Sequence, residues 1–293
     1  MRPAARGDGL ARPYLALLAA LALTVLAAEP ALAWGRIAHQ LVVERATSAL
    51  PRDLKDFYRA HRREMPTLSP DDEATWTEGP ERRFALERFG PFPFRDLPRT
   101  EAAATTRFGD AAREAGRLPW LVQESYDRLV ERYRARQRAE ILAEADRLAG
   151  LVADLHNPLA VTEDFDGQRA GQGGLWTRFA VRLPEALLGQ LHLSVDVAHL
   201  IDDPHGFVFS VMRASYIWAD NVLYEEDLAS RTSAGQSDLY YEALRERLKP
   251  LVQARLELAA RNVASYWYTA WVAAGKPTVS MQNADKPAIE TAR

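Results

Sequence analysis

The sequence predicts an all-α protein. Three long stretches, residues 118–136, 137–156 and 237–275, repeat apolar residues at the spacing of a helix. Segments rich in proline, glycine and polar residues separate the helical stretches. Since no internal repeat and no linker divides the chain, we expect a single multi-helix domain.

The composition excludes several classes of chemistry. The chain has 293 residues, of which 47% are hydrophobic, and this is enough for a sizeable core. Its net charge of -3 gives no strong positive field that would attract nucleic acid. The absence of cysteine excludes disulfides, thiol catalysis and iron–sulfur clusters. Transition-metal binding would depend on six histidines, the acidic residues and backbone groups.

The first 33 residues are typical of an export signal. Three arginines precede an apolar run at 14–28, and a small-x-small cleavage site ends at Ala33. The run is shorter than the roughly 20 residues that cross a bilayer, although an uncleaved anchor is an alternative. We expect a signal peptide at 1–33, a helical domain at 34–276 and a loose tail at 277–293. The protein would then be periplasmic or secreted, with no stable membrane span after cleavage.

The remaining elements follow in chain order. A helix is expected between Trp34 and Pro51, followed by a long ordered loop at 66–100 and, after the two central helices, a second loop at 162–176. Residues 190–198 alternate apolar and polar side chains, which indicates a short extended segment. A helix at 207–228 precedes the last one, which Pro250 is expected to kink or split.

Two sites in this scheme carry candidate metal ligands. After cleavage, Trp34 would offer its amine and carbonyl to a metal in a five-membered ring, and His39 lies about one helical turn further on. Taken alone, this pattern favours a buried tryptophan at a helix start. Asp154 lies in the last turn of an apolar stripe, where a carboxylate needs a cation or hydrogen-bond donors. It could also be a helix-terminal carboxylate that bonds the following loop.

Together, these segments resemble the zinc-dependent phospholipase C and single-strand-specific nuclease superfamily, especially its short bacterial members. The resemblance covers most of the mature chain and depends on the order and spacing of residues 34–39, 78–90, 116–120, 154–162, 165–173 and 266–271. It implies an all-helical fold with three zinc ions in a cleft. It also implies hydrolysis of phosphodiester bonds in phospholipids or nucleic acids.

The ligand set that this resemblance implies is largely replaced. The ligands of one zinc survive as Trp34, His39 and Asp154. One further histidine falls on Arg82, and an aspartate falls on Asp71 or Asp72, with Asp71 preferred. The other implied ligands fall on residues without donor side chains, namely Gly150, Ala160, Trp176 and Ala180.

We therefore expect a degenerate site. At most one zinc ion would bind, with Trp34, His39 and Asp154 as metal ligands and with Asp154 and Asp71 as candidate catalytic groups. If the site holds no metal, Arg82 is expected to pair bidentately with the Asp154 carboxylate. An exposed loop arginine is the alternative for Arg82.

The expected function is that of an exported homologue that is non-catalytic or weakly active. It would bind a phospholipid or phosphodiester ligand in the inherited cleft or serve in an interaction. One alternative is an active metal-dependent phosphodiesterase with a reduced metal site. Another is a structural protein whose cleft is filled by Trp176.

Two further clusters allow more than one interpretation. His192, Asp196 and His199, with His205 nearby, are expected to form a solvated polar face rather than a second metal site. The aromatic run at 266–271 is expected to form core and rim rather than a lipid-binding cleft.

Overall fold

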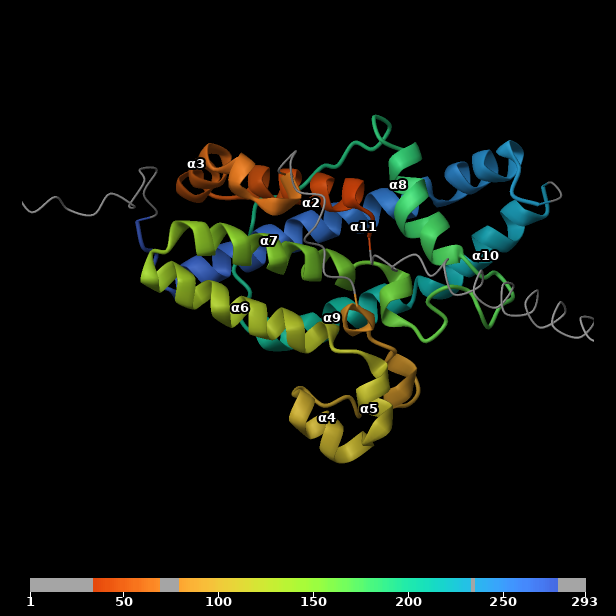
Figure 1. The fold of residues 1–293 in the computed structure, drawn as a ribbon, viewed down its shortest axis with the longest axis horizontal. Coiled ribbons are helices and arrows are strands. Elements are labelled where there is room, and N and C mark those ends of the chain that lie inside the picture. The colour runs from red at the N-terminus through yellow and green to blue at the C-terminus, as the bar shows by residue number, and fades with distance from the viewer. Residues whose placement is uncertain (1–33, 69–78, 233–234, 279–293) are drawn as a thin grey trace, which may run out of the picture. The chain divides into compact units, whose positions relative to one another are not determined.

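The computed structural model describes residues 34–68, 79–232 and 235–278, all of which belong to one compact unit. Within these ranges the regular elements are helices and no strand is present, which confirms the all-α class (Figure 1). None of the helices in the described ranges has the length and apolar character of a membrane span. Residues 1–33 and 279–293, which hold the predicted signal peptide and all but the first two residues of the predicted tail, lie outside the described residues.

The helices are numbered in chain order, and Figure 1 labels them by these numbers. The α-helices are α2 (Arg36–Ala49), α3 (Arg52–Ala60), α4 (Glu101–Phe108), α5 (Asp110–Ala115), α6 (Leu118–Ala135), α7 (Arg138–Leu155), α8 (Leu183–Ala186), α9 (Pro204–Tyr216), α10 (Ala219–Ser230) and α11 (Asp238–Ala273). Short 3-10 turns, among them η3 (Pro80–Arg82), η4 (Leu86–Phe89) and η5 (Pro158–Val161), interrupt the loops, and η6 (Thr177–Arg182) is a π-helix.

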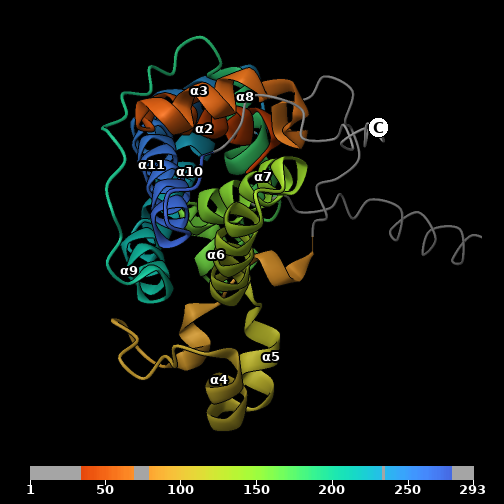
Figure 2. The same ribbon diagram turned by 90° about the vertical axis from the view of Figure 1, so that its left-hand side faces the viewer.

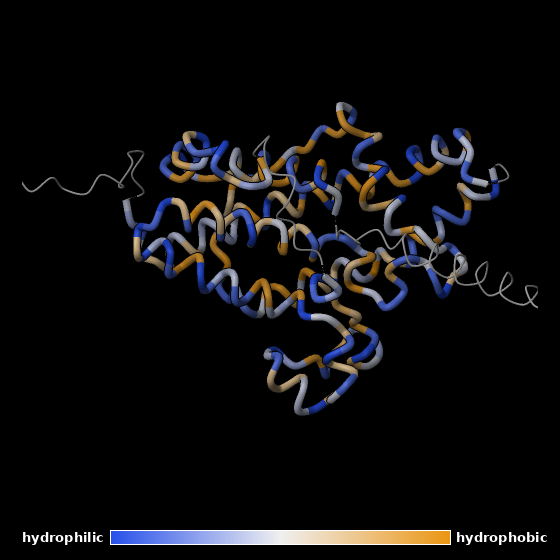
Figure 3. The backbone as a smooth tube through the Cα atoms, in the orientation of Figure 1, coloured by the Kyte–Doolittle hydropathy of each residue, from blue (hydrophilic) through white to orange (hydrophobic). Residues whose placement is uncertain are grey.

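The centre of the unit is formed by α2, α6, α7 and α11. Helix α11 packs against the other three, and α6 packs along α7. Figures 1 and 2 both place α4 and α5 at one edge of this group. Along each helix, hydrophobic and hydrophilic positions are interspersed, as expected of helices with one buried side (Figure 3).

The aromatic run near the end of α11 belongs to the core and its rim, as predicted. Tyr266 and Trp267 have no exposed surface, whereas Tyr268 and Trp271 are partly buried. The Trp267 ring stacks on Tyr58 with 4.5 Å between centroids, and its Nε1 donates to the Ala145 carbonyl at 2.9 Å. Burial of these large rings contributes to packing α11 against α7.

The last two predicted helices differ from the structure. The helix expected at 207–228 is two helices, α9 and α10, which break at Ile217 and Trp218. Both helices contact η5, but α9 packs mainly on α6 and α10 mainly on α11, so the two halves have different main partners. The final helix is neither ended nor split at Pro250, because this residue is exposed and solvent can bond the carbonyl that the ring leaves free.

The extended segment at 190–201 lies along a helix instead of another strand. Its alternation holds at Leu191 and Leu193, which are buried, but Val197 is exposed. Four backbone N–H groups of this segment donate to side chains spaced along α11, from His192 to Gln253, from Ser194 to Glu257, from His199 to Ser265 and from Ile201 to Thr269. These bonds satisfy backbone N–H groups of the extended segment, although no neighbouring strand is present among the described residues to form a sheet.

Candidate functional site

Asp154, like Trp34, is a predicted site residue with no exposed surface. It lies in the last turn of α7, and its side chain has no solvent-exposed surface. An ionised carboxylate in such a place is costly unless charged or hydrogen-bonding partners surround it. The elements that supply those partners are α2 and η3, which come from distant parts of the chain.

Arg82 is one of these partners, which confirms the predicted pairing with Asp154. Its Nε donates to Asp154 Oδ2 at 2.7 Å, and its Nη2 forms an ion pair with the same oxygen. The guanidinium therefore approaches one carboxylate oxygen, not both, and this differs from the predicted bidentate geometry. Its side chain is 14% exposed, so the alternative of an exposed loop arginine is wrong.

His39 occupies the other carboxylate oxygen. Its Nε2 lies 3.1 Å from Asp154 Oδ1, and the imidazole is buried. Because a carboxylate only accepts, the proton of this bond resides on His39 Nε2. The two oxygens of Asp154 thus have separate partners, a permanently charged guanidinium on one and an imidazole on the other.

Trp34 lies directly beside this centre. Its Nε1 donates to the carbonyl of Ala153 at 3.0 Å, and its ring packs against Phe179 with 5.4 Å between centroids. The next residue donates its backbone N–H to Ala180 at 2.9 Å, and a Cβ on Gly35 would lie 3.0 Å from the backbone of Val181. The start of α2 is thereby fixed against α7 and η6.

The structure thus brings His39 and Asp154 together and places Trp34 against the residue before Asp154. Asp71, the remaining candidate catalytic group, falls in 69–78 and lies outside the described residues, as does Asp72. No group of three or more histidine or acidic side chains able to hold a metal occurs in the described part of the chain.

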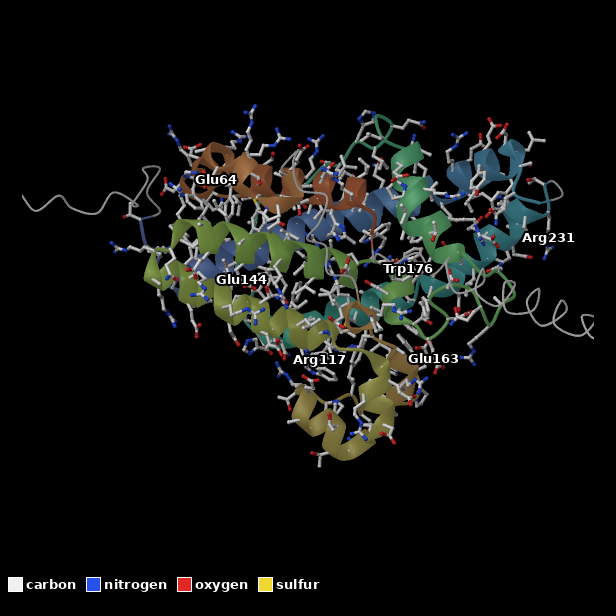
Figure 4. The ribbon with its side chains drawn as sticks, in the orientation of Figure 1. Glu64, Arg117, Glu144, Glu163, Trp176 and Arg231 are labelled. Atoms are coloured by element: carbon white, nitrogen blue, oxygen red, sulfur yellow. The ribbon has the colours of Figure 1, made fainter. Side chains whose placement is uncertain are left out.

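The positions on which the other implied ligands fall are filled by packed side chains. Gly150, Ala160 and Ala180 are buried and provide no ligand atoms. Trp176 is 2% exposed and lies edge-on to Phe165, with 5.9 Å between ring centroids; Figure 4 labels it near α8. The residues present do not fit a trinuclear zinc cluster.

A second buried network adjoins the site, and sequence reasoning missed it. Arg255 of α11 donates to both the carbonyl and the Nδ1 of His156, at 3.0 and 3.1 Å, and to the Ser215 hydroxyl at 2.6 Å. Burial and the nearby charge of Arg255 hold the pKa of His156 well below its usual value. Burial likewise lowers the pKa of Arg255 to about 10.

These contacts also fix the tautomer of His156. Since a guanidinium only donates, His156 Nδ1 accepts, and its proton is on Nε2. Nε2 lies 3.0 Å from Nδ2 of Asn262, whose Oδ1 is buried without a hydrogen-bond partner among the described residues. Exchanging the two ends of this amide places Oδ1 where it accepts the Nε2 proton. The network ties the end of α7 to α9 and α11. Its signal in the sequence was Arg255, a charged residue inside the apolar stripe of the last helix.

The histidines considered for a second metal site do not converge in the structure. His192, Asp196 and His199 are exposed. His199 Nδ1 contacts Ser265 at 3.0 Å, while His205 pairs with Asp127 of α6 at 2.8 Å. This agrees with the expected solvated polar face.

The charge at the centre of the site is therefore balanced within the protein. A buried carboxylate is compensated by one guanidinium and one imidazole, and packed apolar groups occupy the neighbouring positions. A comparison of the chain with protein-family models and with curated proteins found no match in either.

Proposed function

We propose that this protein is an exported, all-helical relative of the zinc-dependent phospholipase C and nuclease superfamily that is not an efficient phosphodiesterase. The observation that carries the proposal is the ion pair between Arg82 and the fully buried Asp154. In place of a metal ion, an internal guanidinium neutralises the carboxylate that the resemblance assigns as a zinc ligand.

The chemistry of the partner explains why activity would be lost. A metal ion lowers the pKa of a bound water and stabilises charge on phosphoryl oxygens. A guanidinium compensates a carboxylate but has no open coordination position for water. Moreover, Asp154 has no exposed surface that a substrate from solution could contact.

Under this proposal the protein holds at most one zinc ion. Its ligands would be His39, Asp154 and the amine and carbonyl of Trp34 once cleavage frees them. The positive charge of Arg82 beside Asp154 opposes a divalent cation there, because like charges repel strongly in a buried place. Any phospholipid or phosphodiester ligand would be bound without being hydrolysed.

The alternative is a hydrolase with a single metal, in which Asp154 and Asp71 are the remaining polar groups. The distance of 3.1 Å between His39 Nε2 and Asp154 Oδ1 favours it, since both atoms could bind the same ion once the Nε2 proton is displaced. A structural protein without a ligand is supported instead by the burial of Trp176.

Hydrolysis assays separate these functions. The mature protein, beginning at Trp34, is expected to show no chelator-sensitive turnover of phosphatidylcholine vesicles or of single-stranded DNA, with or without added zinc. Asp154→Ala is the test variant, and Asp96→Ala, on an exposed carboxylate, is its control. Robust turnover that disappears with chelator and with Asp154→Ala, but persists in Asp96→Ala, would establish the hydrolase instead.

A further inference from the structure

A pocket of about 580 Å³ lies beside η3 and η4 and is separate from the buried Asp154 carboxylate. This volume is in the range of small-molecule sites. Its apolar wall comes from Pro80, Ala85, Ala115 and Phe165. Three arginines and two glutamates, Arg83, Arg88, Arg169, Glu114 and Glu163, add charge to the lining. Figure 4 labels Glu163 close to the 80–89 segment.

Two of the three arginines are already compensated within the protein. Arg88 forms ion pairs with Glu114 and Glu163, and Arg169 pairs with Glu163 at 2.8 Å. With all five groups ionised, three positive and two negative charges leave the lining with one positive charge.

Arg83 is the source of this excess charge. In the described part of the chain no ion pair or side-chain hydrogen bond joins it to a carboxylate, and its Nη1 is buried without a hydrogen-bond partner. Its Cζ lies 3.6 Å from the centroid of the Phe165 ring, so one face of the guanidinium is packed. The N–H groups point out in the guanidinium plane, where a ring face cannot satisfy them.

This arrangement is costly to the protein alone. Burial lowers the pKa of Arg83 from its ordinary value, and the nearby Asp166 only partly offsets this. The Asp166 oxygens themselves accept from the backbone N–H groups of Gly174 and Trp176, both at 2.9 Å. A half-buried guanidinium with no carboxylate partner in the described ranges is a feature that a bound anion would complete.

We propose that this pocket binds an organic monoanion whose two-oxygen acid group pairs with Arg83 and whose apolar part packs on Phe165. The single excess charge fits a monoanion, and the carboxylate of Glu163 in the lining disfavours a dianion. A carboxylate and a phosphodiester share this chemistry, since each offers two oxygens and one negative charge. The site goes beyond the proposed function, because it does not involve Asp154.

Calorimetric titration of the mature protein tests this proposal with four probes. Phenylacetate and methyl phenyl phosphate are the two monoanions, phenylacetamide is the neutral analogue, and inorganic phosphate reports simple ion binding. At least one monoanion is expected to bind at least tenfold more tightly than phenylacetamide and inorganic phosphate. The better of the two identifies the acid group. Equal binding of all four probes would overturn the proposal, and so would binding of none.

Variants assign the binding to Arg83. Arg83→Gln removes the charge and is expected to weaken monoanion binding about 10- to 100-fold, as for loss of a charge-assisted hydrogen bond. Arg107→Gln is the matched control, because Arg107 also lies over an aromatic ring, that of Phe108, but is exposed and already paired with Asp96. Arg83→Lys keeps the charge without the planar fork and is expected to bind at an intermediate strength. Equal affinities in the wild-type protein, Arg83→Gln and Arg83→Lys would contradict the assignment.

Discussion

Replacement of Arg82 by alanine is expected to lower the free energy of unfolding by about 3–5 kcal/mol at pH 7. The substitution leaves the carboxylate of Asp154 fully buried, with His39 as its remaining side-chain partner among those identified above. An uncompensated buried charge is among the most destabilising changes in a protein interior. Urea denaturation of the wild-type and variant chains measures the difference.

A double-mutant cycle isolates the ion pair from the other contacts of Arg82. In the double variant Arg82→Ala with Asp154→Asn, the charge is gone from both sides, so the loss is expected to be smaller than the sum of the two single losses. The matched control is the exposed pair of Arg107 and Asp96, for which removal of the arginine should cost about 1 kcal/mol or less. If Arg82→Ala costs no more than Arg107→Ala, Asp154 does not depend on the guanidinium.

Arg178→Ala is the second substitution with a large expected effect, again about 3–5 kcal/mol. Arg178 pairs with Glu226 at 2.7 Å, and both side chains are only 6% exposed. It also donates to the carbonyls of Gly173 and Gln172, both at 2.9 Å, so the variant loses an anchor of the loop before η6. After the substitution, Glu226 keeps a hydrogen bond from Tyr240 at 3.0 Å, which does not cancel its charge.

Two further variants test whether the loss of stability in Arg178→Ala comes from the buried ion pair with Glu226. Arg182→Ala changes an exposed arginine of the same π-helix, which bonds the Tyr241 hydroxyl, and is expected to cost about 1 kcal/mol or less. Adding Glu226→Gln to Arg178→Ala removes the stranded charge and should recover part of the lost stability, as judged from thermal unfolding. A cost for Arg178→Ala equal to that for Arg182→Ala would show that the buried pair contributes nothing.

The long helices could be predicted because their signal is local. Apolar periodicity locates α2, α6, α7 and α11, and the structure agrees within a few residues at their ends. The short helices α3, α4 and α5, of 9, 8 and 6 residues, were not predicted, since helices of this length depend on tertiary packing. The break between α9 and α10 could not be predicted for the same reason, because it depends on the helices against which each half packs.

The candidate site was predictable only in part. The pairing of Arg82 with Asp154 followed from the resemblance, which brings both to one ligand cluster although 72 positions separate them. No such guide existed for Arg178 and Glu226 or for Arg255 and His156, which are 48 and 99 positions apart. Which buried charges meet is decided by helix packing, and a single sequence does not encode it in any local pattern.

The zinc content of the purified mature protein, measured by elemental analysis after equilibration with zinc and removal of excess metal, tests the central claim most directly. If Arg82 compensates Asp154 in place of a metal cluster, the wild-type protein binds at most one zinc ion per chain. Arg82→His removes the competing charge, adds an imidazole beside His39 and Asp154, and is expected to bind zinc more tightly than the wild-type protein. Two or more zinc ions per wild-type chain, lost in Asp154→Ala, would contradict this account.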